Sequence, residues 1–168
     1  MKKNILLLTL MLLAATNILS QGSRIIKVET KKGNTQTYYL RYYESGTTIL
    51  TNANNPTEDS ITLDTEWRTK MTYKGRSGPD TSTVTETYLD PYLENIQVDE
   101  EDDLMNMFIY YNMKGEVAFV FFSYPSYLNI PMDIFEKMEA DLKKGKLNLE
   151  YKESVDHSKY FRIVFSVS

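Results

Sequence analysis

His157 is the only histidine in the chain. Histidine is the side chain that most often serves in general acid–base catalysis, so His157 is the first candidate for such chemistry. It lies in a polar stretch from Ser154 to Lys159. Catalysis by histidine requires an orienting partner and a nucleophile or substrate within reach. No spacing around His157 indicates either, and we therefore interpret it as a solvated surface residue.

The five consecutive acidic residues at 99–103 offer oxygen atoms that Ca²⁺ could bind. Calcium takes about six to eight oxygen ligands, usually from a loop with ordered spacing and a glycine at its sharp turn. This segment has neither feature, and runs of like charge are commonly solvated linkers. We predict a linker here, with no metal site and no cofactor.

Paired carboxylates could support glycoside hydrolysis, which uses two such groups roughly 5–10 Å apart. Asp64 and Glu66 alternate along a predicted strand and would share one of its faces. Arg68 and Lys70 would lie on that same face, which favours an ion-paired surface. No catalytic residue is therefore predicted, and a small hydrolase built from scattered carboxylates stays as an alternative.

Four tyrosines in the predicted strand 35–43 are the remaining candidates for recognition. Tyr38 and Tyr42 occupy one phase of the strand and Tyr39 and Tyr43 the other, so one pair is expected in the core. Exposed aromatic side chains can mark an interaction surface. Pairing across strands explains them equally well. Tyr39 and Tyr43 are the candidate interaction residues.

The first 20 residues have the layout of a secretory signal. Lys2 and Lys3 precede an apolar run from Ile5 to Ala15, and polar and small residues follow. A membrane anchor needs about 20 apolar residues, which is more than this run supplies. We predict cleavage after Ser20, with a cut after Gly22 as the alternative, and hence a periplasmic or extracellular protein.

Composition narrows the classes of partner. The chain has no cysteine, which excludes disulfides, thiolate metal sites and the acylated cysteine of a lipoprotein. Loss of Lys2 and Lys3 from 19 basic residues, against 23 acidic ones, would change the net charge from −4 to about −6. An acidic protein without a basic stripe is a poor match for nucleic acid or an anionic membrane surface.

The elements that must position these residues fall into two parts on either side of the 99–103 linker. Residues 21–98 are rich in threonine and tyrosine and predict strands but no helix. The strands are expected at 26–29, 35–43, 47–51, 61–74 and 82–89.

The segment 61–74 has the clearest alternation in the sequence. It predicts one long strand with Asp64, Glu66, Arg68 and Lys70 in water. The side chains expected in the core are those of Ile61, Leu63, Trp67, Met71 and Tyr73.

The second part, residues 104–168, predicts the order β-β-α-β-β. Strands at 104–113 and 117–124 precede a helix at 131–144, and strands at 147–151 and 161–167 follow it. The strand at 117–124 is apolar on both faces, as a covered central strand would be. Phe135, Met138 and Leu142 recur at helical spacing and predict the buried face of the helix. We predict one α+β domain at 21–168, mostly antiparallel sheet, with one main helix packed on it and the first-part strands extending the sheet or forming a second layer.

The stretch from Met113 to Val117, the aromatic strand after it, the proline-started helix and the 161–167 strand together resemble TonB C-terminal domains. This resemblance implies a domain that binds a short partner segment in the periplasm. The whole chain also resembles the small uncharacterised secreted proteins of Bacteroidota. Neither resemblance supplies a site residue.

These observations favour an exported, non-enzymatic binding or accessory module of the bacterial envelope. Its partner would be a protein segment or a glycan. The alternative is the small envelope hydrolase acting on glycans. A pocket with converging carboxylates would favour the enzyme, and a bare sheet edge or flat aromatic patch would favour the binding module.

Overall fold

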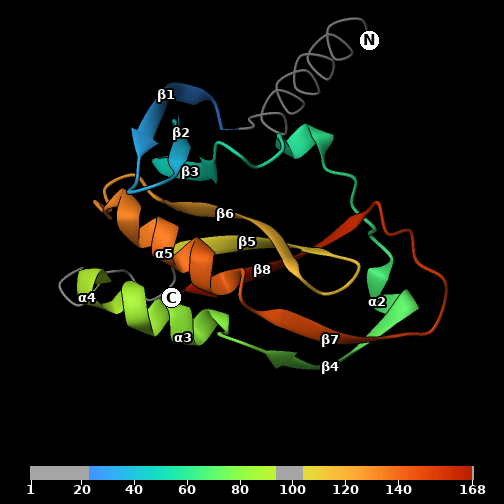
Figure 1. Cartoon of the computed structure of the whole chain (residues 1–168). Coiled ribbons are helices and arrows are strands. Elements are labelled where there is room, and N and C mark those ends of the chain that lie inside the picture. Colours follow the sequence, from blue (N-terminus) through green and yellow to red (C-terminus); the bar gives the residue numbers. More distant parts are fainter. Residues whose placement is uncertain (1–22, 94–103, 168) are drawn as a thin grey trace, which may run out of the picture.

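The computed structural model describes residues 23–93 and 104–167, so the predicted signal at 1–20 and the linker at 99–103 lie outside the described residues (Figure 1). A six-stranded antiparallel sheet forms its centre, in the order β1-β2-β3-β6-β5-β8. The strands before residue 53 therefore belong to the same sheet as the strands after residue 104. These strands are β1 (Ile25–Lys32), β2 (Thr37–Tyr43), β3 (Thr47–Asn52), β5 (Met105–Asn112), β6 (Val117–Pro125) and β8 (Tyr160–Val167).

Two helices and a two-stranded sheet cover one face of the central sheet, here called the inner face (Figure 1). The helices are α3 (Thr81–Tyr88) and α5 (Met132–Leu142), and the small sheet pairs β4 (Met71–Ser77) with β7 (Lys146–Tyr151). Short helical segments are η1 (Glu58–Ser60), α2 (Trp67–Lys70) and α4 (Asp90–Leu93). This is an α+β fold dominated by antiparallel sheet.

Helix α5 packs on the sheet through the face expected from its sequence. Phe135, Met138 and Leu142 are each 0% exposed, which confirms that prediction. Phe135 contacts the rings of Phe122 and Tyr124, both at 5.1 Å between ring centroids. The main core therefore lies between α5 and the centre of the sheet.

Strand β6 is central and covered on both faces, as its apolar sequence indicated. Phe122 and Tyr124 join the inner core, whereas Phe119 and Phe121 join a smaller cluster on the opposite, outer face. A register shift near Tyr111 leaves Val117 with the inner core rather than with Phe119.

The prediction of one strand over 61–74 is wrong. Residues 61–66 cross the outer face, α2 turns the chain, and only Met71–Ser77 forms a strand. Leu63 makes an isolated bridge to Tyr160 of β8. The apolar residues alternate because the segment first covers the outer cluster and then the inner core, and a straight strand could not do both.

This path also reverses two of the predicted side-chain positions. Tyr73, expected in the core, is 56% exposed, and Asp64, expected in water, is 4% exposed. Trp67 is half-buried against the main core. Met71 is buried as expected.

The predicted strand at 82–89 is helix α3, so the first part is not free of helix. Asp80 caps this helix by accepting a hydrogen bond from the Thr83 N–H at 2.8 Å. Val84 and Leu89 are buried. The cap and the burial outweigh the weak strand preference of the threonines.

Strand β7 also departs from the expected single sheet, because it pairs with β4 and not with β8.

Within the described parts of the chain, no helix is both long and apolar enough to span a bilayer.

Candidate functional site

A cleft lies between the inner face of β5 and β8 and the β4–β7 sheet. Its volume is about 250 Å³, slightly below the range of roughly 300–1,000 Å³ typical of small-molecule sites. Side chains from six elements line it, and most of them are apolar. They are Trp67, Tyr73, Arg76, Thr81, Ile109, Tyr111, Leu147, Leu149, Ile163 and Phe165.

The register of the small sheet brings Arg76 to this cleft. Tyr73 lies opposite Leu149, and a shift before Gly75 then places Arg76 opposite Leu147. Without the shift, strict alternation from Tyr73 would turn Arg76 to the other face. The irregularity therefore determines that a cation, rather than a glycine, faces the cleft.

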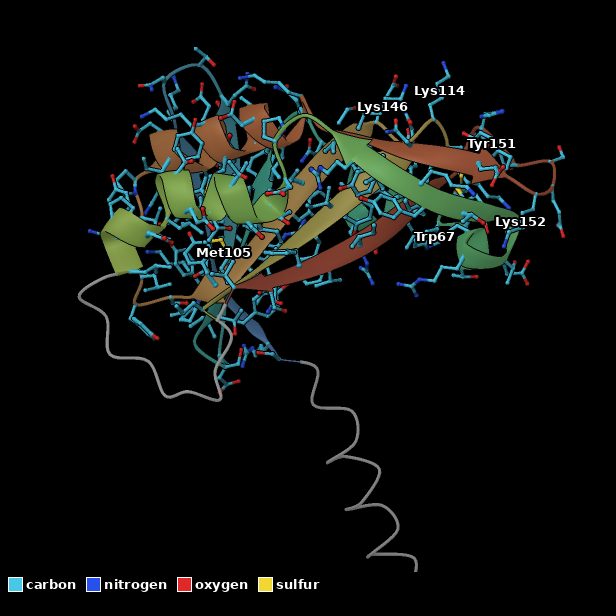
Figure 2. All side chains as sticks on the ribbon, turned by 90° about the horizontal axis from the view of Figure 1, so that it is seen from below. Trp67, Met105, Lys114, Lys146, Tyr151 and Lys152 are labelled. Carbon is cyan, nitrogen blue, oxygen red and sulfur yellow. The ribbon has the colours of Figure 1, made fainter. Side chains whose placement is uncertain are left out.

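Two aromatic residues that line the cleft, Trp67 and Tyr111, stack on the buried ring of Phe161. Trp67 of α2 lies 4.6 Å from Phe161, and Phe161 lies 5.3 Å from Tyr111, measured between ring centroids. Figure 2 shows Trp67 beside α2, with Tyr151 at the same end of the small sheet and Lys146 at the other end. Trp67 lines the cleft and is the only tryptophan in the chain, so tryptophan fluorescence reports on its surroundings there.

Polar groups at the cleft are few. The Nη1 atom of Arg76 donates a long hydrogen bond of 3.5 Å to the Tyr111 hydroxyl. Burial raises the pKa of Tyr111, and the nearby Arg76 charge only partly opposes this. The hydroxyl therefore keeps its proton at neutral pH and is able to donate it to an acceptor.

The tyrosines of β2 are divided between the two faces of the sheet. Tyr38 is fully buried and donates to Glu139 of α5, and Tyr42 is half-buried and donates to Glu29. Burial, together with Glu29, raises the pKa of Tyr42 to about 12.

The two candidate interaction residues lie on the outer phase of β2. Tyr39 is 45% exposed and Tyr43 is half-buried. Tyr39 lines a smaller pocket of about 120 Å³ that also includes Arg41 and Phe121. The structure therefore separates these residues from the cleft, which is on the inner face.

The other candidates lie apart from both pockets. His157 is exposed in the turn before β8. Across residues 23–93 and 104–167, no group of three or more His, Asp or Glu side chains is placed to hold a metal ion. Asp64 and Glu66 both pair with Lys70, at 2.9 and 3.7 Å, so the expected ion pairing is present although Asp64 is not at the surface.

The buried position of Asp64 changes the expected effect of its removal. Its carboxylate accepts hydrogen bonds from Lys70 Nζ and from the Glu66 N–H. Asp64→Ala leaves both donors without that acceptor and should lower the free energy of unfolding by about 1–3 kcal/mol, as measured by urea denaturation at neutral pH. Glu66→Ala removes an exposed partner of the same lysine and should stay within about 0.5 kcal/mol of wild type.

The same contact predicts a pH dependence. The hydrogen bond from Lys70 lowers the pKa of Asp64 below its usual value. The stabilisation is therefore complete above the pKa of the unfolded chain, near 4, and is lost as the pH falls through the lower folded pKa. The stability gap between wild type and Asp64→Ala should narrow below about pH 4, and a constant gap would contradict this.

Sequence reasoning missed the cleft and Arg76, because residue 76 falls between the predicted strands at 61–74 and 82–89. The available signal was the isolated Gly75, since a glycine inside a strand often marks a bulge. The lining as a whole had no signal, because its residues come from segments more than 90 positions apart.

Comparison with known proteins gives a similarity to a solved structure. No family model matches the sequence, and no curated protein matches it. The chain is similar to the crystal structure of a DUF5043 family protein from Bacteroides uniformis ATCC 8492, with 14% sequence identity and a TM-score of 0.46. The similarity covers 83% of this chain and 90% of that chain. The TonB-like resemblance of residues 104–168 stays a prediction.

Proposed function

We propose that the chain is an exported, non-enzymatic binding module of the bacterial envelope, and that its ligand site is the cleft beneath β5 and β8. The observation that supports this is the open apolar volume between two sheets, where a fold of this size would normally close its core. Aromatic and aliphatic side chains with few polar groups are the usual lining of a small-molecule site. The ligand would place an apolar group there, either as a free molecule or as a side chain of a partner protein segment.

The cleft gives the hydrolase alternative no support. Among the described residues, its lining includes neither a carboxylate nor a histidine, and acid–base catalysis would need such a group within hydrogen-bond reach of the substrate.

Two adjacent residues of β8 offer a matched test of the cleft. Ile163 lines the cleft, whereas Val164 is 46% exposed. Successive strand residues point to opposite faces, so Ile163→Phe narrows the cleft and Val164→Phe does not. In a titration with the neutral dye N-phenyl-1-naphthylamine, Ile163→Phe should weaken binding about tenfold or more. Equal affinities of the two variants would contradict the proposed site.

A second candidate function is recognition of an envelope glycan by Tyr39 and Tyr43 on the outer face. The pocket that combines the exposed Tyr39 ring with Arg41 supports it, because sugars are commonly bound by an aromatic face and adjacent polar groups. Calorimetry with soluble peptidoglycan fragments tests this proposal. Tyr39→Ala should abolish the heat of binding, while Tyr127→Ala, which removes a ring that is 66% exposed elsewhere, should not.

Export is part of the same proposal. It is supported by the charged and apolar layout of residues 1–20. N-terminal sequencing after fractionation of a bacterial host should find a chain beginning at Gln21 outside the cytoplasm. Full-length protein in the inner membrane would contradict the cleavage.

A further inference from the structure

Arg76 is a partly buried cation, and two of its three guanidinium nitrogens make no hydrogen bond within the described residues. Its Nε and Nη2 atoms are shielded from water and have no hydrogen-bond partner among the described residues. Nη2 packs against Gly145, just beyond the end of α5, at 2.8 Å from where a side chain on that glycine would begin. Within the described part of the chain, the guanidinium makes one hydrogen bond, the long contact from Nη1 to the Tyr111 hydroxyl.

No carboxylate of the described residues forms an ion pair with Arg76. Asp80 is near enough for Arg76 to help lower its pKa, but the main cause of that shift is the hydrogen bond from the Thr83 N–H. Asp80 is thus engaged in capping α3. Among the residues that the structure describes, the guanidinium therefore lacks a dedicated counter-ion.

Unpaired buried donors are costly, and a buried charge without a partner more so. The Nε and Nη2 hydrogens of a guanidinium point the same way and match the two oxygens of one carboxylate. Few bonds hold the guanidinium in place, so rotating it away from Gly145 and into the cleft breaks only the long contact with Tyr111. A ligand anion would then supply the missing partner.

We propose that the cleft binds a short apolar chain ending in a carboxylate, with the carboxylate held by Arg76 and the Tyr111 hydroxyl. This deepens the proposed function and rests on it. The apolar walls take the chain, while the single cation gives the cleft a preference for a negative head group. The chemistry is that of a medium-chain fatty acid.

The size of the cleft sets the length of that chain. A volume of about 250 Å³ holds roughly eight water-sized groups, at about 30 Å³ each in the liquid, which corresponds to most of a ten-carbon chain. An aliphatic chain of this length has no polar groups to leave unsatisfied between Leu149 and Phe165. A peptide would bury backbone amides there, where the lining offers few partners, and an aliphatic carboxylate is therefore favoured.

Titration of the purified protein with decanoate and decanol, followed by Trp67 fluorescence, tests the proposal. The two probes share the same chain and differ in the charged head. Decanoate should bind about tenfold or more tightly than decanol, since a hydrogen bond to a charged group is worth at least that factor. Arg76→Met should remove this preference, so that the two probes then bind the variant with similar affinity.

Two controls separate recognition from structure. Arg162→Met makes the same charge change on the outer phase of β8, opposite Tyr110, and should keep the preference for decanoate. Without added probe, Arg76→Met should unfold at the same or a higher urea concentration than wild type, because it removes two shielded donors that have no partner among the described residues. A marked loss of stability would instead assign Arg76 a structural role at the end of α5 and overturn the proposal.

The remaining outcomes distinguish the two levels of inference. Equal binding of decanoate and decanol would overturn carboxylate recognition and leave the apolar cleft as the site. Binding of neither probe, with unchanged Trp67 emission, would overturn both. Binding of a Leu-Leu-Phe peptide that is lost on C-terminal amidation, without any binding of decanoate, would overturn the aliphatic ligand in favour of a protein C-terminus.

Discussion

Phe135→Ala should lower the free energy of unfolding by about 3–5 kcal/mol, the usual loss for a phenylalanine truncated in a core. The side chain is 0% exposed and lies 5.1 Å from the rings of both Phe122 and Tyr124. The variant loses this apolar burial, and it also leaves a cavity between α5 and the sheet that these rings cannot fill without breaking their own packing. Urea denaturation of the purified protein measures the change.

A control on the same helix separates core packing from helix propensity. Lys137 is exposed on the opposite face of α5 and forms an i,i+4 ion pair with Asp133 at 3.0 Å. Lys137→Ala should change stability by no more than about 0.5 kcal/mol, since such pairs are weak in water. A loss below about 1 kcal/mol for Phe135→Ala would show that α5 does not pack on the sheet in this way.

Gly115→Ala should cost about 2–5 kcal/mol, although it adds only one methyl group. Gly115 lies in the β5–β6 turn with φ of +80°, a conformation that costs an L-residue roughly 1–2 kcal/mol. The new methyl would also lie 2.2 Å from the carbonyl oxygen of Leu147. That oxygen belongs to the backbone of β7, so relief requires the small sheet to move, and overpacking of this kind costs roughly a further 1–3 kcal/mol.

Gly46 provides the matched control, because it has nearly the same φ, +81°, in the β2–β3 turn. No atom lies within 4 Å of the position that its methyl group would take. Gly46→Ala should therefore cost only the backbone strain, about 1–2 kcal/mol. Thermal or urea unfolding of both variants gives the difference directly. Equal losses would show that the Gly115 turn does not contact β7 as described.

Local patterns predicted much of the second part of the chain. The helical spacing of Phe135, Met138 and Leu142 identified the buried face of α5, and the two-sided apolar run in β6 identified a central strand. Both inferences depend only on the geometry of one element, which fixes the direction of neighbouring side chains. The signal at 1–20 and the roles of Tyr39 and Tyr43 remain predictions.

Patterns failed where one segment serves two different surroundings. The alternation in 61–74 was real, but Leu63 belongs to the outer cluster and Met71 to the inner core, with α2 between them. An alternating pattern indicates which residues are buried, but it does not indicate which part of the protein they pack against. The threonines of α3 likewise favoured a strand until the Asp80 cap and the burial of Val84 outweighed them.

The sequence by itself thus determined the fold class, the buried face of helix α5 and the absence of any thiol chemistry, because these follow from composition and from periodicity within single elements. Only the tertiary structure decided that Asp64 is buried beside Lys70 and that Arg76 faces an apolar cleft. The physical reason is that both environments are made by residues far apart in the chain. Whether a charged side chain has an ion-pair partner depends on tertiary packing and not on its neighbours in sequence.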